Sequence, residues 1–100
     1  MARMTYEIIL SPEAEEDFKK LKAFRRTVVR DAIQKHLRYE PIRQSKSRIK
    51  RLRGIRHPQY RLRIDEIRVY YDVVDDRVEV LAIIEKSQAA LWLKNIGEAK

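Results

Sequence analysis

Short apolar-rich runs, several of them alternating with polar residues, predict five β-strands along the chain. The expected strands span residues 4–10, 48–52, 58–64, 67–74 and 77–85. Two acidic pairs, Asp65-Glu66 and Asp75-Asp76, separate the last three strands and are short enough for tight hairpin turns. Consecutive strands joined by such turns predict an antiparallel sheet.

In three other segments the apolar residues return every three or four positions, which predicts helices. Ser11 and Pro12 carry the signals of a helix start, with Ser as the N-cap and Pro at the first helical position. The first two helices form a hairpin joined near residues 22–25. The apolar positions of the first helix are Ala14, Phe18, Leu21 and then Phe24, and those of the second are Val28, Val29, Ala32, Ile33 and Leu37. A last helix is expected from Lys86 to Ile96, with Gly97 as its C-cap.

The order β-α-α-β-β-β-β-α predicts an α+β fold, in which an antiparallel sheet packs against two N-terminal helices and a C-terminal helix. A length of 100 residues fits one domain, residues 1–100. No apolar run approaches the roughly 20 residues needed to span a bilayer. The chain has no cysteine, which fits a reducing compartment. We therefore expect a single-domain cytoplasmic protein that does not enter a membrane.

The excess positive charge of the chain lies in one segment. Residues 43–68 hold ten Lys or Arg and two acidic residues, whereas the rest of the chain holds thirteen of each sign. A concentrated cationic surface is typical of a protein that binds a polyanion, above all nucleic acid. Basic charge that serves solubility alone is usually dispersed, so that alternative fits this chain less well.

The two-residue turns also predict which residues share a face of the sheet. The core face is expected to hold the pairs Ile64–Ile67, Leu62–Val69 and Tyr60–Tyr71, together with Val78, Val80, Ala82 and Ile84. On the opposite face Arg63 lies across from Arg68, and Arg61 lies across from Tyr70. Leu81 and Ile83 of the next strand are expected to complete this second face.

Two opposed arginines in a sheet favour a bound anion. Like charges directly opposite each other destabilise a sheet, and an anion between Arg63 and Arg68 would relieve the repulsion. The structural alternative is that Asp72 or Glu79 neutralises the cluster. Arginine grips phosphate with two parallel hydrogen bonds and keeps its charge at any accessible pH. The pattern therefore indicates a phosphate site.

With these motifs the chain resembles the RelE/ParE superfamily of toxins from type II toxin–antitoxin systems. The matching segments follow one another over nearly the whole chain: Ser11-Pro12-Glu13-Ala14, Lys19-Lys20-Leu21, Arg51-Leu52-Arg53-Gly54, Tyr60-Arg61-Leu62-Arg63-Ile64 and Ile67-Arg68-Val69-Tyr70-Tyr71. The last two are the most specific. The resemblance implies a small α+β toxin that is neutralised by an acidic antitoxin protein encoded beside it.

The RelE-like branch of that superfamily cleaves mRNA in the ribosomal A site without a metal ion or another cofactor. By the resemblance, Arg61, Arg63 and Arg68 line the active site, and Lys86 supplies a later cation that acts as acid or base. The RNA 2′-hydroxyl attacks the adjacent phosphate and leaves a cyclic phosphate and a free 5′-hydroxyl. The remaining residues expected to bind RNA are Arg48, Lys50, Arg51, Arg53 and Arg56, with Tyr70 as a platform for a base.

The end of the last strand departs from the ribonuclease pattern. The arginine expected near Gln88 and a tyrosine some residues later are absent, and Trp92 is the nearest aromatic residue. Two alternatives therefore stay open beside the endoribonuclease. One is a ParE-like toxin that inhibits DNA gyrase without cutting RNA, and the other is a noncatalytic RNA-binding module.

Several other polar residues have an ordinary structural interpretation. Asp65 and Glu66 are alternative bases, although turn formation explains them better. His57 in the basic loop is able to contact RNA or move a proton, but a loop histidine more often does neither. Glu15-Glu16-Asp17 is expected to be a solvated helix face, and Trp92 is expected to pack. An antitoxin segment is expected to pair carboxylates with the arginines and to bury Leu81 or Ile83.

Overall fold

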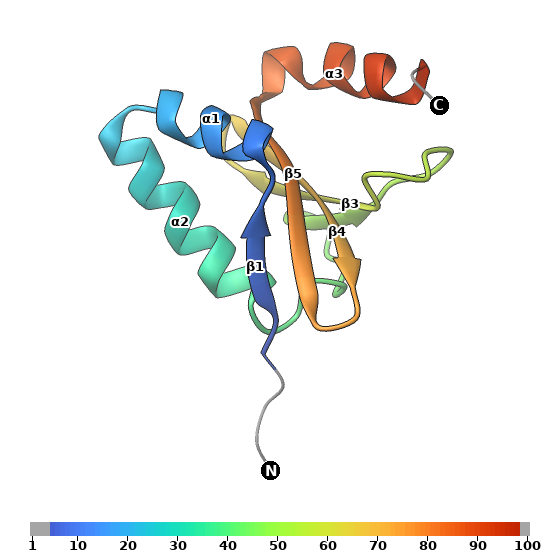
Figure 1. Ribbon diagram of the computed structural model, residues 1–100, viewed down its shortest axis with the longest axis horizontal. Coiled ribbons are helices and arrows are strands. Elements are labelled where there is room, and N and C mark those ends of the chain that lie inside the picture. The colour runs from blue at the N-terminus through green and yellow to red at the C-terminus, as the bar shows by residue number, and fades with distance from the viewer. Residues whose placement is uncertain (1–4, 99–100) are drawn as a thin grey trace.

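The computed structural model describes residues 5–98 as a five-stranded sheet with three helices (Figure 1). The elements are β1 (Glu7–Leu10), α1 (Pro12–Lys20), α2 (Ala23–Leu37), β2 (Ile49–Arg51), β3 (Tyr60–Ile64), β4 (Ile67–Val74), β5 (Arg77–Glu85) and α3 (Lys86–Glu98). The predicted element order and the α+β class are confirmed. The expected start of the first strand at Met4 lies outside the described residues.

The strands lie in the order β1-β5-β4-β3-β2. The predicted antiparallel pairing holds from β2 to β5, whereas the edge strand β1 runs parallel to β5, with Ile8 beside Val78. This exception follows from the connections. The helices α1 and α2 carry the chain from β1 to the opposite edge, where β2 runs in the direction opposite to β1, and three antiparallel pairings then reverse the chain three times. β5 therefore returns beside β1 in the same direction.

One face of the sheet is buried under α1 and α2, which lie together on one side in Figure 1. The predicted pairs are present, with Leu62 facing Val69 and Tyr60 facing Tyr71. The helices contribute Ala14, Val29, Ile33 and Leu37 to the same core. Burial of each large apolar side chain stabilises the fold by about 1.5–3 kcal/mol, so this face supplies most of the stability.

The join between the first two helices is earlier than expected. Leu21 and Lys22 have extended backbone, with ψ of 148° and 152°, and α2 begins directly at Ala23. Phe24 therefore belongs to α2, not to the first helix, and its side chain is 65% exposed. The apolar period of α1 does not continue across the extended link.

A bulge in β5 overturns part of the predicted alternation. Tyr71 pairs with Val80 whereas Tyr70 pairs with Ala82, so Leu81 is an extra residue on β5. One extra residue moves every later side chain to the other face. Ile83 is consequently in the core, and Ala82 and Ile84 lie on the face of Arg68 and Tyr70. The sequence alternation placed these three residues on the wrong faces.

Helix α1 supplies the polar groups that accommodate this bulge. The Ser11 hydroxyl accepts a hydrogen bond from the Ala14 N–H, as expected of the N-cap, and donates one to the Leu81 carbonyl. The Asp17 carboxylate accepts the Ile83 N–H at 3.0 Å. Asp17 is therefore not part of a solvated helix face. Backbone groups that the bulge leaves outside the ladder gain partners in this way.

Two element ends also differ from the prediction. β3 begins at Tyr60 and not at residue 58, because Pro58 has no N–H and the Gln59 N–H donates to the Asp72 carboxylate. α3 continues through Gly97 to Glu98, so Gly97 is not its C-cap. None of the described helices has the length and apolar character needed to cross a membrane.

Candidate active site

Four cations lie on the face of the sheet opposite the α1–α2 core, and we call this surface the basic face. Lys50 of β2 pairs with Arg61 of β3, and Arg63 of β3 pairs with Arg68 of β4. The register is the predicted one, so Arg63 and Arg68 occupy directly opposed positions on neighbouring strands. The basic face is thus built from three neighbouring strands.

Arg68 is the most buried of these cations, with 7% of its surface exposed. Its Nη1 donates hydrogen bonds to the carbonyls of Asp65, at 2.7 Å, and Ile67, at 3.1 Å. Burial lowers the pKa of Arg68 most, and the charges of Arg61 and Arg63 lower it further. The protein therefore holds a cation where its charge is disfavoured, which a bound anion would offset.

Arg61 has a buried donor without a partner. Its Nε is the one buried side-chain nitrogen or oxygen in residues 5–96 that makes no hydrogen bond. Most buried polar groups are paired, and an unpaired one costs about 1–3 kcal/mol. An anion that approaches Arg61 would satisfy this N–H. The sequence identified Arg61, but only the tertiary structure shows that its Nε lacks a partner.

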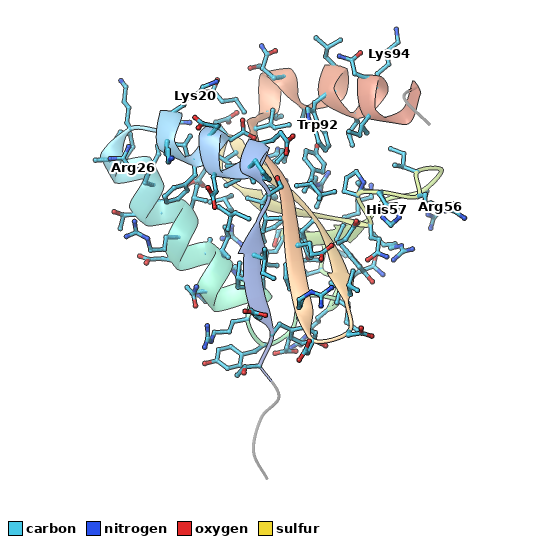
Figure 2. All side chains as sticks on the ribbon, in the orientation of Figure 1. Lys20, Arg26, Arg56, His57, Trp92 and Lys94 are labelled. Atoms are coloured by element: carbon cyan, nitrogen blue, oxygen red, sulfur yellow. The ribbon has the colours of Figure 1, made fainter. Side chains whose placement is uncertain are left out.

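Helix α3 covers part of the basic face. The ring of Trp92 stacks on that of Tyr70, with centroids 4.9 Å apart and planes at 20°, and Figure 2 shows Trp92 reaching from α3 toward the sheet. Tyr70 is 1% exposed, so its ring is not accessible to a base while α3 is in place. The expected role of Trp92 in packing is confirmed.

The loop cations do not share one face. Arg48 stands at the β2 edge of the sheet, where its Nη1 donates to the Arg63 carbonyl at 3.2 Å and it lines a hollow with Lys35 and His36 of α2. Arg51 lies on the face opposite the basic face, where its guanidinium covers the ring of Tyr60 at 5.1 Å from the centroid. Arg53 and Arg56 are exposed in the loop between β2 and β3, where Figure 2 labels Arg56.

The two acids that were candidates for neutralising the arginines bond elsewhere. Glu79 lies 3.3 Å from Arg77 at the far end of β5. The buried Asp72 accepts the Gln59 N–H at 2.7 Å through Oδ1, and its Oδ2 lies 2.8 Å from Nδ1 of His57. Neither carboxylate forms an ion pair with an arginine of the basic face. This result favours the anion interpretation over the structural alternative.

Sequence reasoning missed the contact between His57 and Asp72. The sequence did offer an indication of it. If the predicted pairing of Tyr60 with Tyr71 is continued by one residue, Gln59 stands opposite Asp72, and His57 precedes Gln59 by two residues. The contact depends, however, on the turn that the loop makes before β3. No local pattern specifies that turn.

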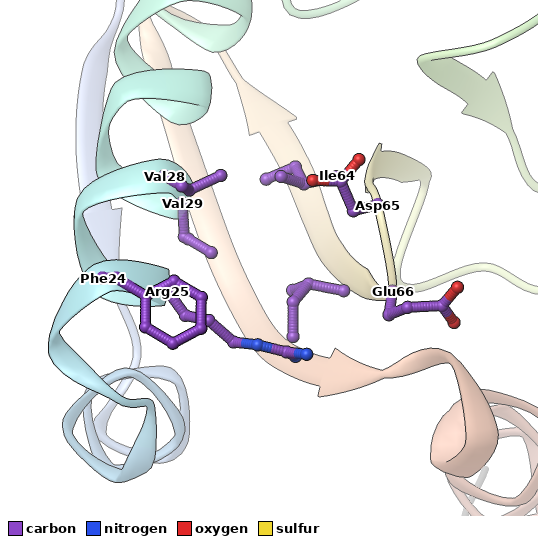
Figure 3. A pocket seen from close by; sticks show the side chains of 8 residues that line it. Phe24, Arg25, Val28, Val29, Ile64, Asp65 and Glu66 are labelled. Atoms are coloured by element: carbon purple, nitrogen blue, oxygen red, sulfur yellow. The ribbon is translucent and has the colours of Figure 1, made fainter.

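A shallow apolar groove of about 140 Å³ lies between the start of α2 and the turn from β3 to β4 (Figure 3). Phe24 and Val28 form one wall, and Asp65 and Glu66 stand at the other. Its rim carries both signs of charge, since Arg25 lies 3.7 Å from Glu85. The groove therefore lacks the anion preference of the basic face.

Known proteins with this arrangement were found among solved structures alone, since no protein-family model and no curated protein matches the sequence. A chain of the RelB–RelE antitoxin–toxin complex from Methanococcus jannaschii has a TM-score of 0.64 at 17% identity, over 84% of this chain and 96% of that one. The RelE–RelB complex from Pyrococcus horikoshii OT3 gives 0.63 at 23% identity, over 85% and 99%. The YoeB dimer from Staphylococcus aureus gives 0.56 at 21% identity, over 81% and 94%.

The chain has the RelE fold. This result confirms the resemblance found in the motifs at the level of architecture. At these identities the likeness extends to the fold, and the chemistry of the site rests on the side chains of this chain.

Within the RelE fold, Lys86 stands at one end of the basic face. It is the exposed first residue of α3, and its N–H donates to the Glu66 carbonyl at 2.7 Å. This bond places Lys86 beside the turn at Asp65 and Glu66, whose Asp65 carbonyl also accepts a hydrogen bond from Arg68. Asp65 has the positive φ of 50° that the tight turn needs, in agreement with its structural interpretation. The described residues hold no cluster of three acidic, histidine or cysteine side chains arranged for a metal ion.

Proposed function

We propose that this protein is the toxin of a type II toxin–antitoxin system and a metal-independent endoribonuclease that cleaves mRNA in the ribosomal A site. The observation that carries the proposal is the pair of opposed guanidiniums, Arg63 and Arg68, beside the unpaired Nε of Arg61. A phosphate group, with its several acceptor oxygens, is able to satisfy all three groups. The RelE fold supports the same function.

In the proposed reaction the RNA 2′-hydroxyl gives up its proton to a base while its oxygen attacks the adjacent phosphorus, and the bond from phosphorus to the 5′-oxygen breaks. The products are a 2′,3′-cyclic phosphate and a 5′-hydroxyl. Arg68 holds the scissile phosphate, while Arg61 and Arg63 stabilise the extra negative charge of the pentacoordinate transition state. The leaving 5′-oxygen takes a proton from the Lys86 ammonium or from water.

Flanking cations extend the proposed RNA path away from this centre. Lys50 continues the basic face across β2, Arg48 stands at that edge of the sheet, and Arg53 and Arg56 project from the next loop. Contacts of this kind are made to phosphates and carry no sequence preference of their own. Binding through them should weaken steeply as salt rises.

The proposed partner in the cytoplasm is an acidic antitoxin whose segment pairs carboxylates with the arginines of the basic face. Leu81 is half-buried and available to such a segment, but Ile83 is 4% exposed and is not. Charge reversal at Arg61 and Arg63 should weaken the complex, and so should added salt. A complex insensitive to both changes would argue against this interface.

The decisive experiment maps transcript ends after the toxin is induced, in parallel with an in vitro assay on ribosomes that carry a defined mRNA. Wild type should produce new 5′-hydroxyl ends within the A-site codon. Arg68→Ala should lower the cleavage rate about 100- to 1,000-fold, the usual cost of removing one group that stabilises transition-state charge. Arg38→Ala is the matched control, because Arg38 is an exposed arginine at the end of α2, away from the basic face. Absence of cleavage by wild type, or full activity of Arg68→Ala, would contradict the proposal.

One observation favours a second candidate, a toxin that inhibits DNA gyrase. Gln88 is an exposed, uncharged residue at the start of α3, where the ribonuclease pattern expects an arginine. A gyrase inhibitor should make relaxed or cleaved plasmid accumulate with purified gyrase while mRNA stays intact. RNA binding without either activity and without toxicity would instead indicate a noncatalytic RNA-binding module.

A further inference from the structure

His57 and Asp72 form a side-chain pair outside the four residues Arg61, Arg63, Arg68 and Lys86 that act in the proposed reaction. Asp72 is a buried carboxylate, with 8% of its side chain exposed, whereas the side chain of His57 is 56% exposed. The backbone N–H of Gln59 holds one Asp72 oxygen, and His57 Nδ1 lies 2.8 Å from the other. Gln59 in turn accepts the Val73 N–H, so β4 and the loop are fixed to each other.

This geometry sets the tautomer of His57. A carboxylate accepts hydrogen bonds, so Nδ1 carries the hydrogen and the lone pair of the neutral ring is on Nε2. No partner for Nε2 is found among residues 5–96. The exposed ring therefore presents a free acceptor, Nε2, to an approaching hydroxyl group.

The pair borders the part of the basic face where a donor is unpaired. Along β4, Asp72 follows Tyr70 by two residues on the same face, and Tyr70 pairs with Arg61. Arg61 is the residue whose buried Nε lacks a partner. Figure 2 shows His57 on the loop that extends beneath α3, on the side of the sheet from which Trp92 approaches. A phosphate bound at Arg61 would have this loop as its neighbour.

We infer that His57 is the general base of the proposed RNA cleavage and that Asp72 is its positioning residue. The inference rests on the proposed function. His57 Nε2 takes the proton from the 2′-hydroxyl as the 2′-oxygen bonds to phosphorus, and the bond to the 5′-oxygen breaks. The 5′-oxygen gains a proton from Lys86 or water, and the imidazolium returns its proton to solvent.

The test measures single-turnover cleavage on mRNA-programmed ribosomes as a function of pH. His57→Ala should lower the rate at least about 100-fold, in line with general base catalysis. It should also remove the fall in rate on the acid side of the profile, and added imidazole should restore part of the rate. His36→Ala is the matched control, because it removes the other histidine of the chain, which lies on α2.

Asp72→Asn tests the positioning role. An asparagine keeps one acceptor but presents an NH₂ group that cannot accept from Nδ1, so the favoured tautomer is lost. The rate should fall about 10- to 100-fold with ribosome binding unchanged, a loss of the size seen when a supporting hydrogen bond is removed. Other charged groups near the pair are Glu79, opposite Asp72 on β5, and Arg61 on β3. Glu79→Gln should leave the acid limb of the profile in place.

The outcomes separate this inference from the proposed function. Wild-type cleavage that persists in His57→Ala, with an unchanged pH profile, overturns the role of His57 and leaves the ribonuclease proposal standing. A loss of rate that imidazole does not restore and that accompanies a lower melting temperature also overturns it, in favour of a structural tie. His57→Gln, which keeps a polar side chain in the loop, should be as inactive as His57→Ala while it melts like wild type. No cleavage by wild type overturns both proposals.

Discussion

The two faces of the β3–β4 hairpin are made by alternate residues of the same strands, yet they are stabilised in opposite ways. On the core face Leu62 meets Val69 under two helices, and both side chains are fully buried. On the basic face Arg63 meets Arg68, and the neighbouring Arg61 has an unpaired donor. The first arrangement lowers the free energy of the folded chain, whereas the second raises it in the absence of a ligand.

The core face stabilises this small domain, whereas the basic face carries the candidate site. A chain of 100 residues has little stability to spare. Repulsion between opposed arginines persists in such a chain because the core face and its helices offset the cost. Substitutions on the two faces should therefore have separable consequences, which the following experiments measure in order of expected size.

The largest effect is expected from a pair of neighbours on β3. Leu62→Ala should lower the free energy of unfolding by about 2–5 kcal/mol, because it leaves a cavity in the core. Arg63→Ala should change it by less than about 0.5 kcal/mol or raise it slightly, because the exposed arginine repels Arg68. Urea denaturation of both variants checks the comparison. Equal losses at the two positions would show that the faces are not separable.

A buried hydroxyl on the core face should give the next largest effect. Tyr71 donates a hydrogen bond to the Pro41 carbonyl at 2.6 Å, and burial raises the pKa of Tyr71 above its ordinary value of 10.0. Tyr71→Phe should cost about 1–3 kcal/mol, since the carbonyl loses its partner.

The raised pKa of Tyr71 also makes the free energy of unfolding depend on pH. The unfolded chain loses the tyrosine proton near pH 10.0 while the folded chain keeps it, so the free energy of unfolding falls as the pH rises above that value. Tyr71→Phe should show a shallower fall in alkaline denaturation curves. An unchanged slope would mean that Tyr71 is not the group responsible.

A smaller effect is expected where α3 meets the basic face. Trp92 of α3 stacks on Tyr70 of the sheet. Leu91 and Ile96 of the same helix are exposed, so they add little to the attachment of α3. Trp92→Ala should lower the free energy of unfolding by roughly 1 kcal/mol more than the loss of buried apolar area explains, the usual size for an aromatic pair. In the wild-type protein Trp92 is the single tryptophan, so fluorescence reports on α3 alone. The fluorescence should change at a lower urea concentration than the circular dichroism of the sheet. Coincident transitions would show that α3 unfolds together with the core.

The smallest effect is expected from His36 on α2. Burial, assisted by Arg48 and Lys35, lowers the pKa of His36 below its ordinary 6.5. The unfolded chain therefore binds a proton first as the pH falls, and the free energy of unfolding decreases below pH 6.5. His36→Gln should flatten this dependence in thermal melts between pH 5 and 7. A steeper dependence in the variant would contradict the assignment.

Alternation along the strands was sufficient to identify most of the candidate site. Because β3 and β4 are joined by a two-residue turn, their register follows from the turn, and Arg63 stands opposite Arg68 as predicted. The same argument failed in β5 after Val80. The bulge at Leu81 depends on the Ser11 hydroxyl and the Asp17 carboxylate, which come from a distant helix.

The element order, the basic segment and the arginines that share a face could thus be predicted from the sequence, since the spacing of apolar residues and the length of turns are local properties. Long-range packing was needed to show that β1 is parallel to β5, that Ile83 belongs to the core and that Trp92 covers Tyr70. It also brought His57 to Asp72. Each of these features depends on contacts between segments far apart in the chain, which no local pattern encodes.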